Sequence, residues 1–344
     1  ESLKKGLDSH SVDIQTAAII SEILKSGLAG DKTEGLERNL VDLGTYFLEV
    51  GDFQALNHLH GQLIGCEQSL PGIPYSPQKK TLTAFETPEF MDGVLRGVRS
   101  WGKEKYPHIE KLAKQIGKPF IEPVLGYLAE EASLSIRRFY IDLLIKMGDG
   151  VRGAALSRLR DKRWYFVRNL ILVLRHLDDP SILPAIKKLR AHRHPRVREE
   201  VLKTLSYFQD PDAEQMLLED LSSQEREVQR SAVQLAEDCR GPEVFHKLLE
   251  LLNRGGIFGA DFDLKMEVIR TLAKIGNPES LPHLGRLLRS RSFLHRQSTN
   301  RLKAEAIGSL EFYPAKEAIP FLERFSNDRE LANRVSQTLI KIMA

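Results

Sequence analysis

Apolar residues recur in a nine-residue pattern that repeats along the last two thirds of the chain. The clearest copy has Val197, Val201 and Leu205 at its first, fifth and ninth positions, with Arg198 at the second. Apolar residues at this spacing lie on one face of an α-helix. Copies start at residues 136, 166, 197, 228, 264, 302 and, more weakly, 331. A period of about thirty residues, with two insertions, predicts two helices and two turns in each unit.

A shorter first helix is expected before each patterned second helix. Ile182, Leu183, Ile186 and Leu189, for example, form one apolar stripe at helical spacing. Asp-Pro or Asn-Pro pairs begin new units at residues 179–180, 210–211 and 277–278. Such pairs favour the start of a helix, because Asp or Asn caps the exposed amides and Pro suits the first turn.

The patterned second helix followed by Asp-Pro resembles the HEAT-repeat family, of the bacterial HEAT-like kind, over residues 121–344. The resemblance implies an all-α fold, a right-handed α-solenoid of stacked antiparallel helix pairs. In the family, the cation of the second helix forms a structural ladder that links helices or binds turn carbonyls. The residues that match this ladder are Arg137, Arg168, Arg198, Lys265 and Lys303, for which ligand contact is the alternative role. The family's acid in the turn within a repeat is matched by Glu131 and Asp161, whereas later units have His192 and Ser223.

The preceding third of the chain is less regular. We expect an N-terminal helical segment over residues 1–70, which looks solenoid-like, a Pro-rich linker or loop over 71–87, and a helical lead-in over 88–120, before the repeats of 121–344. The chain begins at Glu1 without a methionine, so we expect it to be a piece of a longer protein.

Composition and motifs exclude several classes of protein. Apolar residues make up 42% and charged residues 28% of the chain, which indicates an ordered protein. The two cysteines, Cys66 and Cys239, suggest neither a disulfide framework nor a zinc site, and no apolar run is long enough to cross a bilayer. No nucleotide-binding loop, metalloprotease motif or nucleophile elbow occurs, and Gly255-Gly256 reads as a turn. We therefore expect a cytoplasmic protein that is not an enzyme and has no cofactor, metal or membrane partner.

Charge is distributed unevenly along the repeats. Residues 151–203 carry fourteen Lys or Arg against five Asp or Glu, whereas residues 204–250 carry four against eleven. The cations gather at turns between the first and second helices of two successive units, and we expect a basic edge formed by Arg158, Arg160, Lys162, Arg163, Trp164, Arg190, His192, Arg193, His194 and Arg196. The turns between units are instead acidic, at Asp149, Asp178, Asp179, Asp210 and Asp212. Helix dipoles account for one or two charges at each turn, which leaves several cations unexplained.

Two functions fit these features. The first is a protein-interaction scaffold that presents a concave surface of second helices, together with the basic edge, to a protein, a peptide or an acidic partner. The alternative is a HEAT-like module that binds nucleic acid through the basic band at 152–203, where phosphates would neutralise the cations and Trp164 could stack on a base. Some HEAT-like DNA glycosylases bind DNA on such a surface, but no glycosylase carboxylate can be assigned, and a phycobilisome-type lyase is a third reading that rests on fold analogy.

Overall fold

The computed structural model describes residues 15–20, 22–23, 33–69, 77–238, 241–254, 259–290 and 295–343, and every regular element in them is a helix. The chain forms two compact units, which are Glu1–Asp179 and Pro180–Ala344. Their boundary falls at an Asp-Pro pair inside the predicted repeats, and the divisions expected near residues 70, 87 and 120 stay predictions. Several sequence predictions lie outside the described residues or side chains: the loop over 71–76, the Gly255-Gly256 turn, Cys66 and Cys239.

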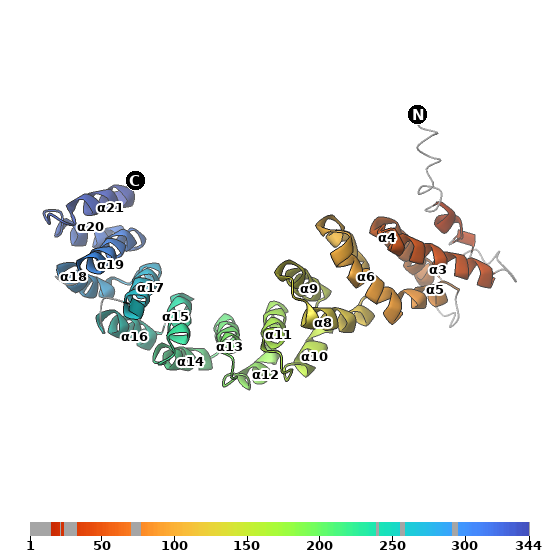
Figure 1. Cartoon of the computed structure of the whole chain (residues 1–344), viewed down its shortest axis with the longest axis horizontal. Coiled ribbons are helices and arrows are strands. Elements are labelled where there is room, and N and C mark those ends of the chain that lie inside the picture. The colour runs from red at the N-terminus through yellow and green to blue at the C-terminus, as the bar shows by residue number, and fades with distance from the viewer. Residues whose placement is uncertain are drawn as a thin grey trace, which may run out of the picture. The chain divides into compact units, whose positions relative to one another are not determined.

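The first unit is an α-solenoid of two layers of helices. One layer contains α3 (Thr33–Glu49), α6 (Pro88–Ser100), α8 (Ile121–Glu130) and α10 (Gly150–Ser157), each of which packs on the next. The other contains α4 (Phe53–Ser69), α7 (Tyr106–Ile116), α9 (Leu134–Met147) and α11 (Trp164–His176), again packed in order. The short helices η2 (Lys103–Lys105) and η3 (Lys118–Phe120) lie in the connections. Figure 1 shows α8 and α10 on the opposite side of this stack from α9 and α11.

The second unit repeats the arrangement with five helix pairs. Its first helices are α12 (Leu183–Lys187), α14 (Asp212–Leu221), α16 (Pro242–Asn253), α18 (Leu281–Arg289) and α20 (Ala315–Glu323). Its second helices are α13 (Pro195–Tyr207), α15 (Arg226–Leu235), α17 (Gly259–Ile275), α19 (Arg296–Ser309) and α21 (Ala332–Met343), and each of these packs on the next (Figure 1). The short helices η4 (Pro180–Ile182), η5 (Ala236–Asp238), η6 (Pro278–Ser280) and η7 (Leu310–Phe312) complete the pairs. The predicted antiparallel helix pairs are confirmed.

The core of both units follows the nine-residue pattern. In the six clear copies the fifth and ninth residues are at most 1% exposed, and they are Tyr140, Leu144, Leu170, Leu174, Val201, Leu205, Ala232, Ala236, Val268, Leu272, Ala306 and Leu310. Because helices on both sides cover these positions, each repeat buries apolar surface that a single helix pair would leave exposed.

Each second helix ends in a turn that suits its sequence. The last residue before the next unit has a positive φ in four copies, at Gly148, Asp178, Gln209 and Gly276. Asp210 and Asn277 then accept hydrogen bonds from the amides of Asp212 and Glu279, both at 3.0 Å, as expected for residues that cap the next helix.

The predicted loop over 71–87 is wrong in its second half, where α5 (Pro77–Phe85) packs against α3 and α4. Pro77 stands at the start of this helix, where proline is tolerated. Leu82 and Phe85 are buried, and the Phe85 ring lies directly against Gly44 of α3. Two apolar residues after a Pro-rich stretch are too few to indicate a helix by spacing alone. The helix is instead stabilised by its packing on α3 and α4.

The left-handed turn at Gln209 provides a test of the repeat boundaries. We expect Gln209→Gly to stabilise the protein by up to about 1 kcal/mol, because glycine adopts positive φ without a steric penalty. Gln215→Gly, in the middle of α14, should instead destabilise by roughly 1 kcal/mol. Thermal denaturation of both variants measures this, and a loss of stability in Gln209→Gly would contradict the assigned turn.

Candidate functional site

The part of the basic edge that lies in the first unit is largely ion-paired. Arg158, which caps α10, forms an ion pair with Glu122 in the first turn of α8. Arg163 binds Asp161 at 2.7 Å and also Glu130, and its guanidinium lies over the Phe166 ring. The hydrogen bond from Arg163 lowers the pKa of the Asp161 carboxyl and raises that of the guanidinium. These two arginines are therefore already neutralised within the chain.

Three further predicted residues of this part differ in exposure. The side chains of Arg160 and Lys162 are exposed, beyond the paired arginines. Trp164, the first residue of α11, is partly buried and meets the Tyr165 ring edge-on at 5.9 Å between centroids. Part of the indole surface is therefore in contact with the Tyr165 ring.

The part of the basic edge in the second unit forms a hydrogen-bonded turn before α13. The His192 ring accepts the amide of His194 at 3.0 Å, and the His194 ring accepts the amide of Arg196 at 3.3 Å, which caps α13. Burial, and then the neighbouring cations, lower the pKa of His194. Arg190 reaches Glu219 of α14 at 2.6 Å. Arg193 and Arg196 are exposed.

In three copies the residue at the ladder position donates hydrogen bonds to carbonyls near the turn within the repeat. Arg137 donates to the carbonyl of Ala132 at 3.4 Å, and Arg198 donates to those of His192 and Arg193 at 3.0 and 3.4 Å. Gln229, which replaces the cation in its copy, donates to the Leu221 carbonyl at 2.8 Å. These acceptors lie at or beyond the end of a first helix, where carbonyls lack partners in the helix itself.

The remaining ladder residues have different surroundings. Arg168 donates to the side chain of Asn169 at 3.4 Å. Lys265 and Lys303 are both buried, and burial lowers the pKa of Lys265. Their depth places them between neighbouring helices rather than on the surface.

The family's acid–cation ladder is replaced by other partners. Glu131 is 4% exposed and binds Arg99 of α6 at 2.9 Å, while it accepts the amide of Ser133 at 2.7 Å. Asp161 binds Arg163 rather than Arg168. The acids of these turns thus tie each turn to an arginine other than the ladder residue.

Three acids of the turns between repeats, Asp179, Asp210 and Asp212, are also ion-paired. Asp179 forms an ion pair with Arg152 of α10. Lys187 at the end of α12 binds both Asp210 and Asp212, at 2.9 and 3.1 Å. Burial raises the pKa of Asp210, but hydrogen bonds from Lys187 and the Asp212 amide outweigh this effect and lower it overall. Both kinds of turn therefore hold some of their charges in pairs.

The sequence analysis missed a network of ion pairs, with one further hydrogen bond, on the second helices of the second unit. Gln234 donates to Glu267 at 3.0 Å, Arg270 to Glu305 at 2.7 Å and Lys341 to Glu311 at 3.0 Å, and Lys274 binds Glu237. Each contact joins one second helix, or the short helix that follows it, to the next. The available signal was opposite charges separated by about one repeat, but side-chain reach cannot be read from that spacing.

One hollow on this face retains exposed cations. A space of about 510 Å³ between α19 and α21 is lined by Arg296, Gln297, Asn300, Arg301, Ala304 and Arg334. Arg296 is paired with Glu330 at 2.8 Å, and Arg301 lies over the Phe262 ring at 5.0 Å. Arg301 and Arg334 form no ion pair with a described residue. We call this the α19–α21 hollow.

Neither a metal site nor a membrane span emerges from the described residues. No three His, Cys, Asp or Glu side chains among them gather as metal ligands. None of the described helices is both long and hydrophobic enough to cross a bilayer.

The repeat pattern and the fold agree with a known family. Residues 153–236 match the family model of HEAT repeats, so this segment of the chain is similar to HEAT repeats. The two units have the architecture of that class, an all-helical solenoid.

Structures of Kap121p are among the solved structures with the same fold. They include Kap121p bound to Nup53p (TM-score 0.52, 14% identity) and the karyopherin Kap121p bound to the extreme C-terminus of the protein phosphatase Cdc14p (TM-score 0.52, 15% identity). Both alignments cover 98% of this chain and 40% or 41% of Kap121p, so the chain spans about two fifths of that length. At this identity the likeness shows the fold alone. No curated protein matches the chain.

Asp220, at the end of α14, gives a pH-dependent test of this charged region. Burial raises the pKa of its carboxyl to about 6 from an ordinary 3.8, although Arg198 and Arg190 oppose the shift. The folded state therefore holds a proton that the unfolded chain releases, and stability should fall as the pH rises from about 4 to about 6. We expect Asp220→Asn to raise the melting temperature at neutral pH and to flatten this part of the pH profile.

Thermal melts across this pH range provide the measurement. Asp263→Asn, which alters an exposed carboxyl of α17, is the control and should leave the profile unchanged. A profile that is the same in Asp220→Asn and in the parent chain would contradict the assignment.

Proposed function

We propose that this chain is a non-enzymatic scaffold that binds a protein partner on the second helices of its second unit. The observation that carries the proposal is the ion-pair network of that face. Its charges are of both signs and pair across neighbouring helices, as in the contacts of Arg270 with Glu305 and of Lys274 with Glu237. A repeated face of this kind offers a wide contact area with little net charge, which suits a protein surface.

The α19–α21 hollow is the site proposed for an acidic segment of that partner. Arg301 and Arg334 are exposed there, and Gln297 and Asn300 add amide groups. Arginine binds carboxylates through paired hydrogen bonds, so an acidic peptide has the matching chemistry. Exposed Tyr207 on α13 and Ile340 on α21 supply apolar contact on the same layer of helices.

The predicted basic edge has a secondary role in this proposal. Arg160 and Lys162 in the first unit, and Arg193 and Arg196 in the second, are its exposed cations. They would attract an acidic partner at long range and speed its association. A concave binding surface and a cytoplasmic location belong to the same proposal.

The ion pairs favour a protein over a nucleic acid. Phosphates would have to displace Glu122 from Arg158, Glu130 and Asp161 from Arg163, and Glu219 from Arg190. That competition offsets much of the gain from counterion release. The Kap121p structures, solved with Nup53p and with part of Cdc14p, add only an analogy of fold.

A charge reversal in the hollow tests the proposal. A fluorescent Glu-rich peptide should bind the parent chain, and Arg301→Glu with Arg334→Glu should weaken binding roughly tenfold or more, about 1.4 kcal/mol, because two attractive contacts become repulsive. The matched control is Arg286→Glu with Lys316→Glu, on the first helices of the same repeats, which should bind like the parent. Fluorescence anisotropy gives the affinities.

Duplex DNA and single-stranded RNA, each at roughly 50 and 200 mM salt, complete the experiment. Tight binding of either, lost on Arg160→Glu with Arg193→Glu, would replace the proposal with the nucleic-acid alternative. Equal peptide binding by the hollow and control variants would also overturn it.

A further inference from the structure

An open cavity lies between α4 and α7 of the first unit. Its volume is about 670 Å³, many times the ~30 Å³ share of one water molecule. Both helices contribute to its lining, which contains one lysine, Lys111, and no acid among the described residues. We call this cavity the α4–α7 groove, and it belongs to a different unit from the α19–α21 hollow.

Asn57 brings an unused hydrogen-bond acceptor to the α4–α7 groove. Its side chain is 4% exposed, and its Nδ2 donates to the carbonyls of Phe53 at 2.6 Å and His108 at 2.8 Å. Because both partners are acceptors, these bonds fix which end of the amide is the oxygen. That oxygen, Oδ1, has no hydrogen-bond partner among the described residues. A buried carbonyl oxygen without a donor is unfavourable, so this position favours a ligand that donates a hydrogen bond.

Two glutamines provide further acceptors beside the groove. The Nε2 of Gln62 lies 3.0 Å from the His58 ring, and a Cβ atom at Gly61 would stand 3.5 Å from the Nε2 of Gln115. The Oε1 atoms of both glutamines are buried and lack partners in the described part of the chain. From Asn57 to Gln62 the helix rises by about 7.5 Å. This is close to the spacing of roughly 7 Å between every second residue of an extended chain, whose N–H groups point to the same side.

The charge of the lining indicates what kind of donor fits. A lysine or arginine of a ligand would find no carboxylate among the described lining residues and would be repelled by Lys111. A main-chain N–H is a neutral donor, and the carbonyl beside it can accept from Lys111. Ala55 and Pro107 add apolar surface that suits small side chains. The lining therefore matches an extended chain with short, uncharged side chains.

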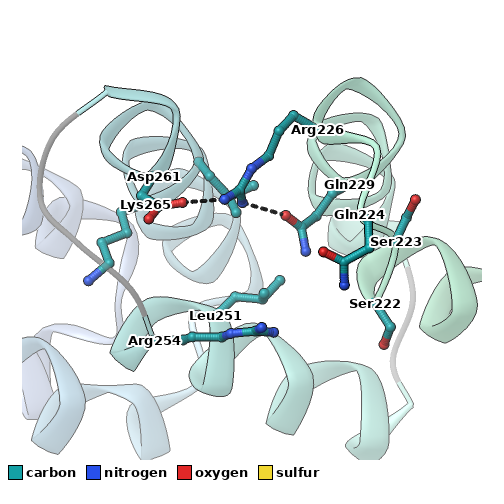
Figure 2. Close-up of a pocket in the computed structure, with 10 residues that line it drawn as sticks. Ser222, Ser223, Gln224, Arg226, Gln229, Leu251, Arg254, Asp261 and Lys265 are labelled. Atoms are coloured by element: carbon teal, nitrogen blue, oxygen red, sulfur yellow. Dashed lines mark hydrogen bonds and ion pairs between the residues drawn. The ribbon is translucent and has the colours of Figure 1, made fainter.

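The polar cavity of the second unit shown in Figure 2 lacks such an arrangement. Its volume is about 220 Å³, and its Arg226 is already bound to Asp261 at 2.6 Å. In Figure 2 the ammonium of Lys265 and the hydroxyls of Ser222 and Ser223 lie on opposite sides of the cavity and point away from it. These groups do not converge on one ligand, so the α4–α7 groove is the better-defined site.

We propose that the α4–α7 groove binds the main chain of an extended protein segment that carries short, uncharged side chains. The Oδ1 of Asn57 accepts one main-chain N–H of the segment, and Gln62 or Gln115 accepts another. Because the Oδ1 is itself buried, the segment displaces exposed side chains of the lining, such as Gln54. This site goes beyond the proposed function, because it uses another unit, other residues and a neutral ligand.

A tetra-alanine peptide with blocked ends is the probe, and NMR titration of the whole chain gives its Kd. The side-chain amide signals of Asn57 should shift as the peptide binds. An analogue with ester bonds in place of the inner peptide bonds lacks their N–H donors. It should bind about fivefold more weakly than the peptide, because each lost donor removes a hydrogen bond.

Two variants locate the site. Lys111→Trp places a bulky ring in the groove and should raise the Kd at least about fivefold. Its matched control is Lys114→Trp, which changes an exposed lysine of the same helix that does not line the groove and whose contact with Glu110 is 4.0 Å long. Asn57→Leu removes the acceptor and should abolish the preference for the peptide over the ester, with folding verified by circular dichroism.

Three results would overturn the site. They are the absence of tetra-alanine binding, equal affinities of the parent chain for the peptide and the ester, and equal effects of Lys111→Trp and Lys114→Trp. The last two comparisons do not require Asn57→Leu to fold. None of these results bears on the binding of an acidic peptide at Arg301 and Arg334, so this test and that of the scaffold function fail independently.

Discussion

Burial of the apolar positions on the second helices is the constraint on which the rest of this structure depends. Within each unit, residues such as Val201, Leu205, Val268 and Leu272 are closed off between their own first helix and neighbouring second helices. Their repeat of about thirty residues fixes the register of one helix pair on the next. The turns, the paired charges and the α19–α21 hollow take their positions from that register.

The fixed register explains why many surface charges form pairs between neighbouring repeats. Once successive second helices are aligned, residues about one repeat apart lie opposite each other, as Arg270 and Glu305 do. The same alignment brings Lys187 to Asp210 and Arg190 to Glu219 along the turns. A chain that appears to have basic and acidic bands in sequence therefore has far less unbalanced charge in three dimensions. The exposed arginines of the α19–α21 hollow mark the place where an acidic partner would find cations.

The helix pairs could be predicted from the sequence because the buried apolar residues recur at fixed spacings along each second helix. The predicted apolar positions lie in the second helices, α9 to α21 in alternation, or directly next to them, as Ala236 and Leu310 do. Helix α5 could not be predicted, because its packing on α3 depends on Phe85 meeting Gly44, a contact between residues distant in sequence. The ion pairing of the basic-edge residues could not be predicted either. Pairs such as Arg158 with Glu122 depend on how far side chains extend from one helix to the next in a layer. The α19–α21 hollow had no sequence signal at all, since its arginines come from two different repeats.

The most direct test of the stacked register is chemical cross-linking between second helices. In a chain whose Cys66 and Cys239 are replaced by alanine, cysteines introduced at Gln234 and Glu267 should be joined efficiently by a short bis-maleimide, because their native side chains meet at 3.0 Å. A pair at Gln234 and Glu305, on second helices separated by α17, should not be joined. Cross-linking of the second pair in preference to the first would contradict the layered arrangement.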